Sequence, residues 1–212
     1  MGFEMTSRTL RRRGGQVTFN FDIDKAVAAL LYFASDDGRV TTFDKYKAGK
    51  LMFLADKYHV VRYGRPIFGD FYKALPWGPI PQNLLRSVDA VIEGHINFEH
   101  ASRIARAIKL DRTYENPRIH AAELPDRSAL SGSDIEALNF VISEHGKKTF
   151  EELMALTHHM AAYRKAWETR KKGSKQALMR YEDFFDEDSG AVAGAREEMI
   201  ENAELRKSFS AF

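Results

Sequence analysis

The sequence predicts a mainly α fold (α+β): a compact helical domain with a small β hairpin or sheet. Apolar residues recur at helical spacing through much of the chain, which indicates amphipathic helices. Two capping-box patterns, Ser133 with Glu136 and Thr149 with Glu152, mark helix starts. Residues 65–74 cannot continue a helix because Pro66 lacks an N–H donor and Gly69 interrupts the run, so they predict a short hairpin or extended loop.

The helices of the first half can be bounded by their capping residues. The first is expected to begin near Asp22, because the apolar residues after it share one helical face. A second is expected after Thr42 as N-cap, with Gly64 as its stop. A third is expected at Pro81, whose missing donor costs nothing in a first turn, and to run to Gly94.

The second half predicts one strand pair and three further helical segments. Residues 106–111 and 118–122 are expected to pair as strands around the turn at 115–117. Helices follow from Ser133 and Thr149, and residues 172–174 are a break. A terminal helix near 190–207 has an apolar face formed by Val192, Ala195, Met199 and Ala203. We therefore expect a flexible basic arm (1–18), one domain (19–188) and a C-terminal helix (189–212) packed on or extending that domain.

Composition narrows the class of protein. The chain has 212 residues and no cysteine, which suits one domain and excludes a disulfide scaffold, a thiolate zinc site and a cysteine nucleophile. The arginine-containing N-terminus has no apolar h-region after it, so it is not expected to be a secretory signal. No apolar run approaches the roughly 20 residues that span a bilayer. A cytoplasmic protein without membrane contact is expected.

The net charge of +2 gives no general attraction to nucleic acid, but the charges are unevenly placed. Arginines gather at residues 8–13, and basic residues dominate 164–180. Residues 182–188 then carry five acids and no base. These runs are typical of solvated surface; the alternative is a bipolar surface that orients a charged partner.

The sequence predicts no enzyme, cofactor or metal site. The P-loop, the G-x-G-x-x-G loop and the G-x-S-x-G elbow are absent from the sequence. His158 and His159 are adjacent, so on a helix their side chains point about 100° apart and cannot readily share one ion. Glu151 and Glu152 form a carboxylate pair of the kind common on solvated helix faces.

The most informative segment is Lys50–Pro81, in which a helix runs into a turn rich in aromatic residues, glycine and proline. Phe68, Phe71, Tyr72 and Trp77 lie in this turn. Aromatic residues on a rigid turn are typical of binding surfaces, because little entropy is lost on docking. The alternative is that these rings fill the junction between helices, and the residues alone leave both interpretations open.

The same segment resembles the Panacea domain, also described as SocA-like or phage-associated. The resemblance rests on the runs K-L-M-F-L-A-D (50–56), Y-G-R-P-I (63–67), G-D-F-Y-K-A (69–74) and P-W-G-P-I-P (76–81). The later helices near Ser133 and residues 156–167 are also similar, so that the likeness covers about residues 20–180. It implies a mainly helical domain with a small β element.

The resemblance also implies an antitoxin that silences a toxin encoded by a neighbouring gene through direct protein contact. Its candidate partner-binding residues here are Arg65, Phe68, Asp70, Tyr72, Trp77 and Pro79, although Asp70 has the alternative of capping the local backbone.

Two further functions stay open. A proteolytic adaptor, as the SocA protein is, would deliver the toxin to a ClpXP-type protease through a second surface. A nucleic-acid-binding regulator would use Arg8–Arg13 and the basic residues of 164–180. Many family members carry an added DNA-binding segment, but the sequence shows no helix-turn-helix with a basic recognition helix.

Overall fold

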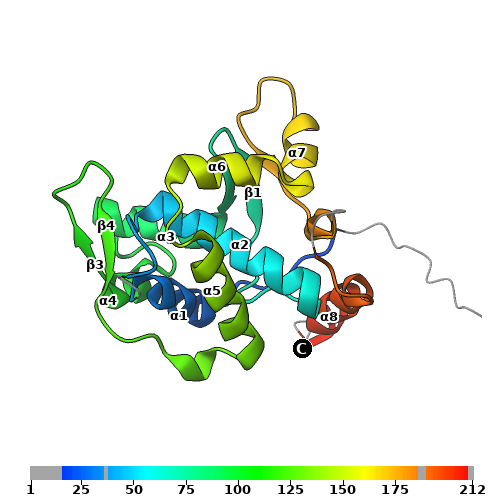
Figure 1. The fold of residues 1–212 in the computed structure, drawn as a ribbon, viewed down its shortest axis with the longest axis horizontal. Coiled ribbons are helices and arrows are strands. Elements are labelled where there is room, and N and C mark those ends of the chain that lie inside the picture. The colour runs from blue at the N-terminus through cyan, green and yellow to red at the C-terminus, as the bar shows by residue number, and fades with distance from the viewer. Residues whose placement is uncertain (1–15, 36–37, 186–189, 210–212) are drawn as a thin grey trace, which may run out of the picture.

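The computed structural model describes residues 16–35, 38–185 and 190–209 (Figure 1). In this part of the chain, helices dominate and are accompanied by two small antiparallel sheets, which confirms the predicted fold class. Residues 1–15 of the predicted basic arm, with its arginines, lie outside the described residues, as do residues 186–188 of the acidic run.

Helix α2 (Lys45–Tyr63) runs through the middle of the fold and is buried on most of its surface (Figure 1). Its central residues, Leu51–Ala55, are apolar and almost wholly inaccessible. A helical stretch that is apolar on all sides belongs in an interior, and here the other elements pack around it. Those in contact with it include α1 (Ile23–Ala34), α3 (Gln82–Glu93), α5 (Gly132–His145), α6 (Phe150–His158) and α8 (Ala195–Phe209).

The ends of α1 and α2 are set by side-chain and glycine caps. Asp22 caps α1 as predicted, since its carboxylate accepts from the Lys25 amide. The N-cap of α2 is Asp44 and not Thr42, so the predicted start was wrong by two residues. A carboxylate at Asp44 accepts two amides at once, from residues 46 and 47. At the other end, Gly64 takes the left-handed conformation (φ 60°) and ends α2 as predicted.

A three-stranded sheet with the order β2-β1-β5 follows α2. Strand β1 (Tyr72–Leu75) pairs antiparallel with β2 (Gly78–Pro81), and β5 (Ala177–Leu178) pairs with β1 from the far end of the domain. The expected hairpin thus exists, but its strands begin at Tyr72, and residues 65–71 form the loop before it. Pro81 is the N-cap of α3, directly before the first helical residue, and Gly94 ends that helix as predicted.

The second sheet confirms the other predicted strand pair. Strand β3 (Ile108–Asp111) pairs antiparallel with β4 (Arg118–Ala121), while Arg106 and Ala107 belong to α4 (Ala101–Ala107). The Ile119 amide donates to the Phe43 carbonyl at 2.7 Å. This bond places the loop between β3 and β4 next to the start of α2.

Helix α5 begins two residues earlier than predicted, and its capping box is Ser131 with Asp134 rather than Ser133 with Glu136. The reason is that Asp134 is fully buried and also receives Lys25 at 2.8 Å and Arg65 at 3.0 Å. Burial would raise the pKa of Asp134, but hydrogen bonds from His59 and Lys25 hold it below its usual range. The predicted capping box of α6, Thr149 with Glu152, is confirmed.

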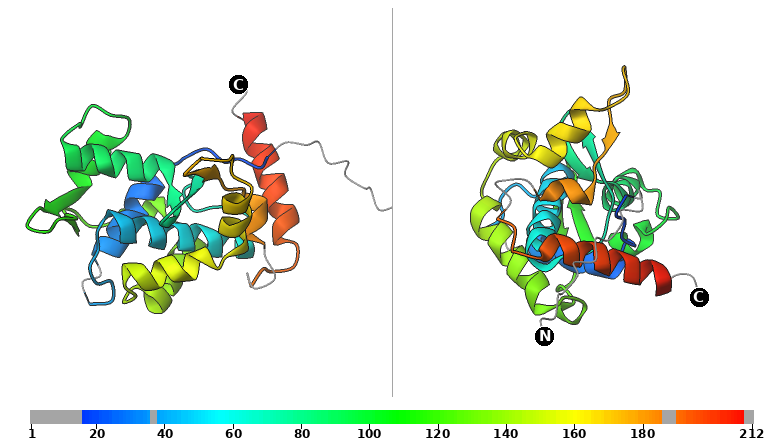
Figure 2. Two further views of the ribbon diagram at one scale, coloured as in Figure 1. Left: turned by 90° about the horizontal axis from the view of Figure 1, so that it is seen from above. Right: turned by 90° about the vertical axis from the view of Figure 1, so that its right-hand side faces the viewer.

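Helix α8 lies across the C-terminal end of α2 (Figure 2). Its buried residues Ala195, Met199 and Ala203 match the predicted apolar face, whereas Val192 precedes the helix and is 49% exposed. The Asn202 side chain donates to the Gly64 carbonyl at 3.1 Å. Between α6 and α8 the chain forms α7 (Ala161–Glu168), β5 and a 3-10 turn at Tyr181–Phe184; another 3-10 turn, Arg127–Ala129, precedes α5. None of the helices in the described ranges combines the length and the apolar character that crossing a membrane requires.

Candidate partner-binding site

The loop between α2 and β1 is fixed by hydrogen bonds to the side-chain carboxylate of Asp56, a residue of α2. It accepts from the Ile67 amide at 2.7 Å, the Phe68 amide at 3.4 Å and the Tyr72 hydroxyl at 2.9 Å. Burial raises the pKa of Asp56 to about 7, although these three donors lower it. Asp56, the last residue of the K-L-M-F-L-A-D run, thus accepts hydrogen bonds from residues of the two runs that follow it in sequence.

Asp70 has a matching role at the start of α3. Because the N-cap position is Pro81, it has no side-chain acceptor of its own, and the carboxylate of Asp70 accepts from the Asn83 and Leu84 amides, both at 2.9 Å. The Tyr181 hydroxyl donates to the Asp70 carbonyl. Asp70 is fully buried, and burial raises its pKa to about 6. The Asp70 side chain therefore caps backbone amides, which is the alternative stated for it above.

The six candidate partner-binding residues do not form one surface. Phe68, Asp70 and Tyr72 are at most 1% exposed, and Pro79 is buried as well. Arg65 is partly exposed and pairs with Asp134 beyond the C-terminal end of α2. Trp77 is 59% exposed at the tip of the β1–β2 hairpin, near the N-terminal end of α2. Trp77 is thus the member of this set that offers a large accessible surface; partner contact by any of the six stays a prediction.

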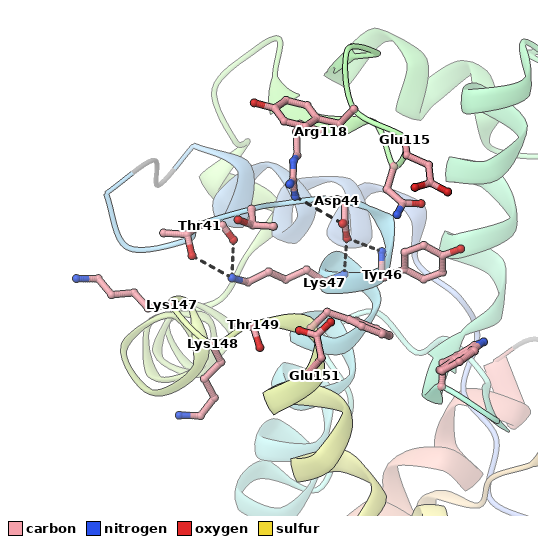
Figure 3. Close-up of a pocket in the computed structure, with 15 residues that line it drawn as sticks. Thr41, Asp44, Tyr46, Lys47, Glu115, Arg118, Lys147, Lys148, Thr149 and Glu151 are labelled. Atoms are coloured by element: carbon pink, nitrogen blue, oxygen red, sulfur yellow. Dashed lines mark hydrogen bonds and ion pairs between the residues drawn. The ribbon is translucent and has the colours of Figure 1, made fainter.

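Trp77 borders a surface pocket of about 730 Å³. Four segments meet there: the start of α2, the β1–β2 tip, the β3–β4 loop and the α5–α6 loop (Figure 3). The pocket is within the size range of ligand sites. Its lining residues are Thr41, Thr42, Asp44, Tyr46, Lys47, Trp77, Tyr114, Glu115, Asn116, Arg118, Lys147, Lys148, Thr149, Phe150 and Glu151.

One end of this pocket is built from hydrogen-bonded charged groups. The Lys47 ammonium is almost fully buried and donates to the Thr41 carbonyl, and burial lowers its pKa to about 8. The Arg118 guanidinium lies 3.6 Å from the Asp44 carboxylate (Figure 3). Thr42, which lies between Thr41 and Asp44 in sequence, has a φ of 57°, a left-handed conformation that β-branched residues rarely adopt. Such strained backbone is concentrated at functional sites, which favours this pocket as one.

The turn end of the hairpin rests on a second buried lysine, Lys50. Its side chain is fully buried, donates to the Pro79 carbonyl at 3.1 Å and lies 5.8 Å from the centre of the Phe150 ring. Desolvation lowers the pKa of Lys50 to about 7, and among the described residues no carboxylate pairs with it. A Cβ at Gly78 would lie 2.9 Å from the Lys50 nitrogen, so the glycine, which has a φ of 100°, is required there.

The histidine pair and the charged runs lie apart from this pocket, whereas Glu151 of the carboxylate pair lines it. His158 stacks on the Tyr163 ring at 4.4 Å, while His159 is exposed. In the parts of the chain that the structure describes, no three His, Asp or Glu side chains are placed to hold a metal ion. Most of the exposed basic residues of 164–180 lie on α7 and on the loop that joins it to β5, at the upper right of Figure 1. The acids of α8 are exposed as well, and this helix lies at the lower right of the same view.

Sequence reasoning missed most of the pocket. Lys47, Tyr114, Glu115, Arg118 and Phe150 were not candidates for binding. No local signal marks them, because the pocket is assembled from segments that lie up to about a hundred residues apart in the chain. The predicted strand pair was the signal that came nearest to the pocket, because Tyr114, Glu115 and Asn116 lie in the loop between its strands.

The family model described as "Antitoxin SocA-like, Panacea domain" matches residues 49–168. The chain belongs to this family. The Panacea match runs from α2 to α7 and includes the β1–β2 hairpin, Asp56, Asp70 and most of the pocket. No curated protein and no solved structure matches the chain.

Proposed function

We propose that this Panacea protein is the antitoxin of a type II toxin–antitoxin pair and neutralises its cognate protein toxin by direct binding. Family membership across residues 49–168 supports an antitoxin role. The observation that carries the proposal further is Trp77, a large aromatic side chain 59% exposed on a hairpin whose base is hydrogen-bonded to α2 and α3.

The hairpin suits a protein interface because its shape is fixed before binding. Tyr163 donates to the Leu75 carbonyl, and Lys50 donates to the Pro79 carbonyl, on either side of the tip. A rigid aromatic residue loses little conformational entropy when it docks. Exposed tryptophans on such supports are the usual energetic centres of interfaces. We therefore assign the toxin contact to Trp77 and the pocket beside it.

Co-expression with the neighbouring reading frame tests this. The neighbour should arrest growth alone and be harmless with this protein, and the two should co-purify. Trp77→Ala should weaken neutralisation while leaving the urea unfolding midpoint nearly unchanged. Leu124→Ala is the matched control, because Leu124 is 86% exposed and lies outside the pocket. A neighbour that is not toxic, or whose toxicity is unrelieved, refutes the function; full rescue by Trp77→Ala refutes the placement.

A proteolytic adaptor is the second candidate, and α8 gives it a specific basis. This helix exposes four glutamates together with Ile200 (41%) and Leu205 (56%), which is a surface that the core does not use. An adaptor needs such a second surface for a ClpXP-type protease. The half-life of the toxin in cells with and without the protease separates the two functions, because simple blocking leaves that half-life unchanged.

A further inference from the structure

The end of the pocket next to the hairpin is walled by aromatic rings. Tyr46 and Phe150 contact each other with their ring centres 5.7 Å apart, and Trp77 at the hairpin tip adds a third ring. Electron-rich ring faces attract cations, and tryptophan attracts them most strongly. Two rings of the pocket lining already bind cations of the protein itself: Lys45 lies over Tyr46, and Arg118 lies over Tyr114.

Two carboxylates also line this pocket. Glu115 comes from the β3–β4 loop and Glu151 from the first turn of α6 (Figure 3). Both residues are exposed, and within the described residues neither carboxylate has a hydrogen bond or an ion pair. They are therefore available to a ligand without breaking an existing interaction.

The cations of the pocket are not available in the same way. Lys47 is buried and bonded to Thr41, and Arg118 is paired with Asp44. Lys147 and Lys148 lie on the side of the pocket opposite to Glu115 (Figure 3). The accessible, unpaired charge beside the aromatic wall is thus negative.

A purely structural explanation covers only part of this arrangement. Glu151 stabilises the N-terminus of α6 through the helix dipole, and Glu115 at a turn is well hydrated. Neither effect requires a cavity of about 730 Å³ between the carboxylates and an aromatic wall that includes a 59% exposed tryptophan. A cationic guest accounts for the cavity, the rings and both carboxylates together.

We propose that this end of the pocket binds an arginine side chain of the protein partner. The planar guanidinium stacks on the aromatic wall and donates to Glu115 and Glu151. Arginine fits better than lysine, because its flat group stacks on rings while its fork of N–H donors reaches carboxylates. The proposal rests on the proposed function and specifies the chemistry of the toxin residue that is recognised.

The test uses the purified full chain and a small probe, so it needs no toxin. N-acetyl-arginine amide is titrated while the indole N–H resonances of Trp77 and Trp167 are followed by NMR. Trp167 is an internal control, since Arg170 already covers its ring at 4.0 Å. The neutral isostere N-acetyl-citrulline amide controls for charge. We expect a saturable shift of Trp77 alone, with arginine binding about tenfold tighter than citrulline.

Variants assign the effect to the carboxylates. The double variant Glu115→Gln/Glu151→Gln should weaken arginine binding about tenfold, while Glu201→Gln on the exposed face of α8 should not change it. An equal response to citrulline, an unshifted Trp77 resonance, or unchanged binding by the double variant each overturns the proposal. A Trp77 shift with inorganic phosphate in place of arginine also overturns it, because the site would then accept anions.

The outcome is separable from that of the proposed function. If the pocket binds no arginine but the protein still neutralises its toxin, only this inference is wrong. If arginine binds but the neighbouring gene product is not toxic, the site is real and the antitoxin function is wrong. Where both hold, Glu115→Lys/Glu151→Lys should lose neutralisation in cells.

Discussion

Replacing Lys50 with methionine should make the protein more stable at neutral pH, although Lys50 begins the most family-like segment of the chain. Its ammonium is fully buried, and its one hydrogen-bond acceptor is the Pro79 carbonyl. Methionine has nearly the same length and flexibility and carries no charge. The substitution therefore removes the desolvation cost with little change in packing.

The magnitude follows from the pKa of Lys50, which burial lowers from 10.5 to about 7. Between these values the unfolded chain holds a proton that the folded chain releases, so the stability of the wild type rises with pH across this window. The whole difference corresponds to ~5 kcal/mol, most of which is a cost at pH 7. Methionine leaves the Pro79 carbonyl without its donor, which costs about 1–3 kcal/mol. The expected net gain at pH 7 is about 2 kcal/mol.

The assay is urea unfolding of both proteins at pH values from about 6.5 to 10. The Lys50→Met variant should be the more stable protein near pH 7, its advantage should vanish at about pH 9, and by about pH 10 the wild type should be the more stable, because it keeps the hydrogen bond to Pro79. Taking the difference between the two proteins cancels the titration of all other groups. A variant that is less stable at pH 7, with a difference that does not change with pH, would refute the reasoning, since the buried lysine would then carry no desolvation cost.

Three further changes probe the support of the site by urea unfolding. Gly78→Ala should lower the free energy of unfolding by about 1–3 kcal/mol, because the added Cβ would contact the Lys50 nitrogen and the backbone φ is 100°. The loss should exceed that for Gly173→Ala, where φ is 83° and no atom lies within 4 Å of the added Cβ; equal losses would contradict this. Asp56→Ala should cost at least ~3 kcal/mol, since three buried donors lose their acceptor; a cost below about 1 kcal/mol would show that water replaces it. Asp134→Asn should remove part of the stability that the wild type loses below about pH 4, because the pKa of Asp134 is held below 3.8 in the fold, so that its stabilisation is complete above that value and is lost as the pH falls below it; an unchanged acid profile would argue against this.

The fold was largely predictable because its signals are local. Helical periodicity, Gly64 as a stop and Thr149 as a cap each act within one or two turns of chain, and all three were right. The two shifted helix starts have a common cause. Asp44 replaces Thr42 as the cap of α2, and Asp134 replaces Glu136 as the acid of the α5 capping box; each of these acids also pairs with a basic residue distant in sequence. Such long-range pairing is not visible in a capping pattern.

The candidate site was less predictable because conspicuous residues are not always accessible ones. Aromatic residues in a Gly/Pro turn indicate rigidity, but not the direction of each side chain. Phe68 and Tyr72 point into the core, while Trp77, nine residues after Phe68, points out. The capping role of Asp70 was anticipated only as an alternative, since a capping acid and a partner-binding acid have the same sequence pattern.

The two carboxylates beneath the hairpin have a consequence for how the protein opens. Asp70 holds the first turn of α3 from thirteen residues upstream, and Asp56 holds the loop before β1 from within α2. The hairpin therefore cannot lift away while α3 stays capped, and the two should open as one cooperative unit. In hydrogen exchange, the amides of Ile67 and Leu84 should share one opening free energy although they belong to different elements. Tension applied by a partner at Trp77 would be carried directly into the central helix.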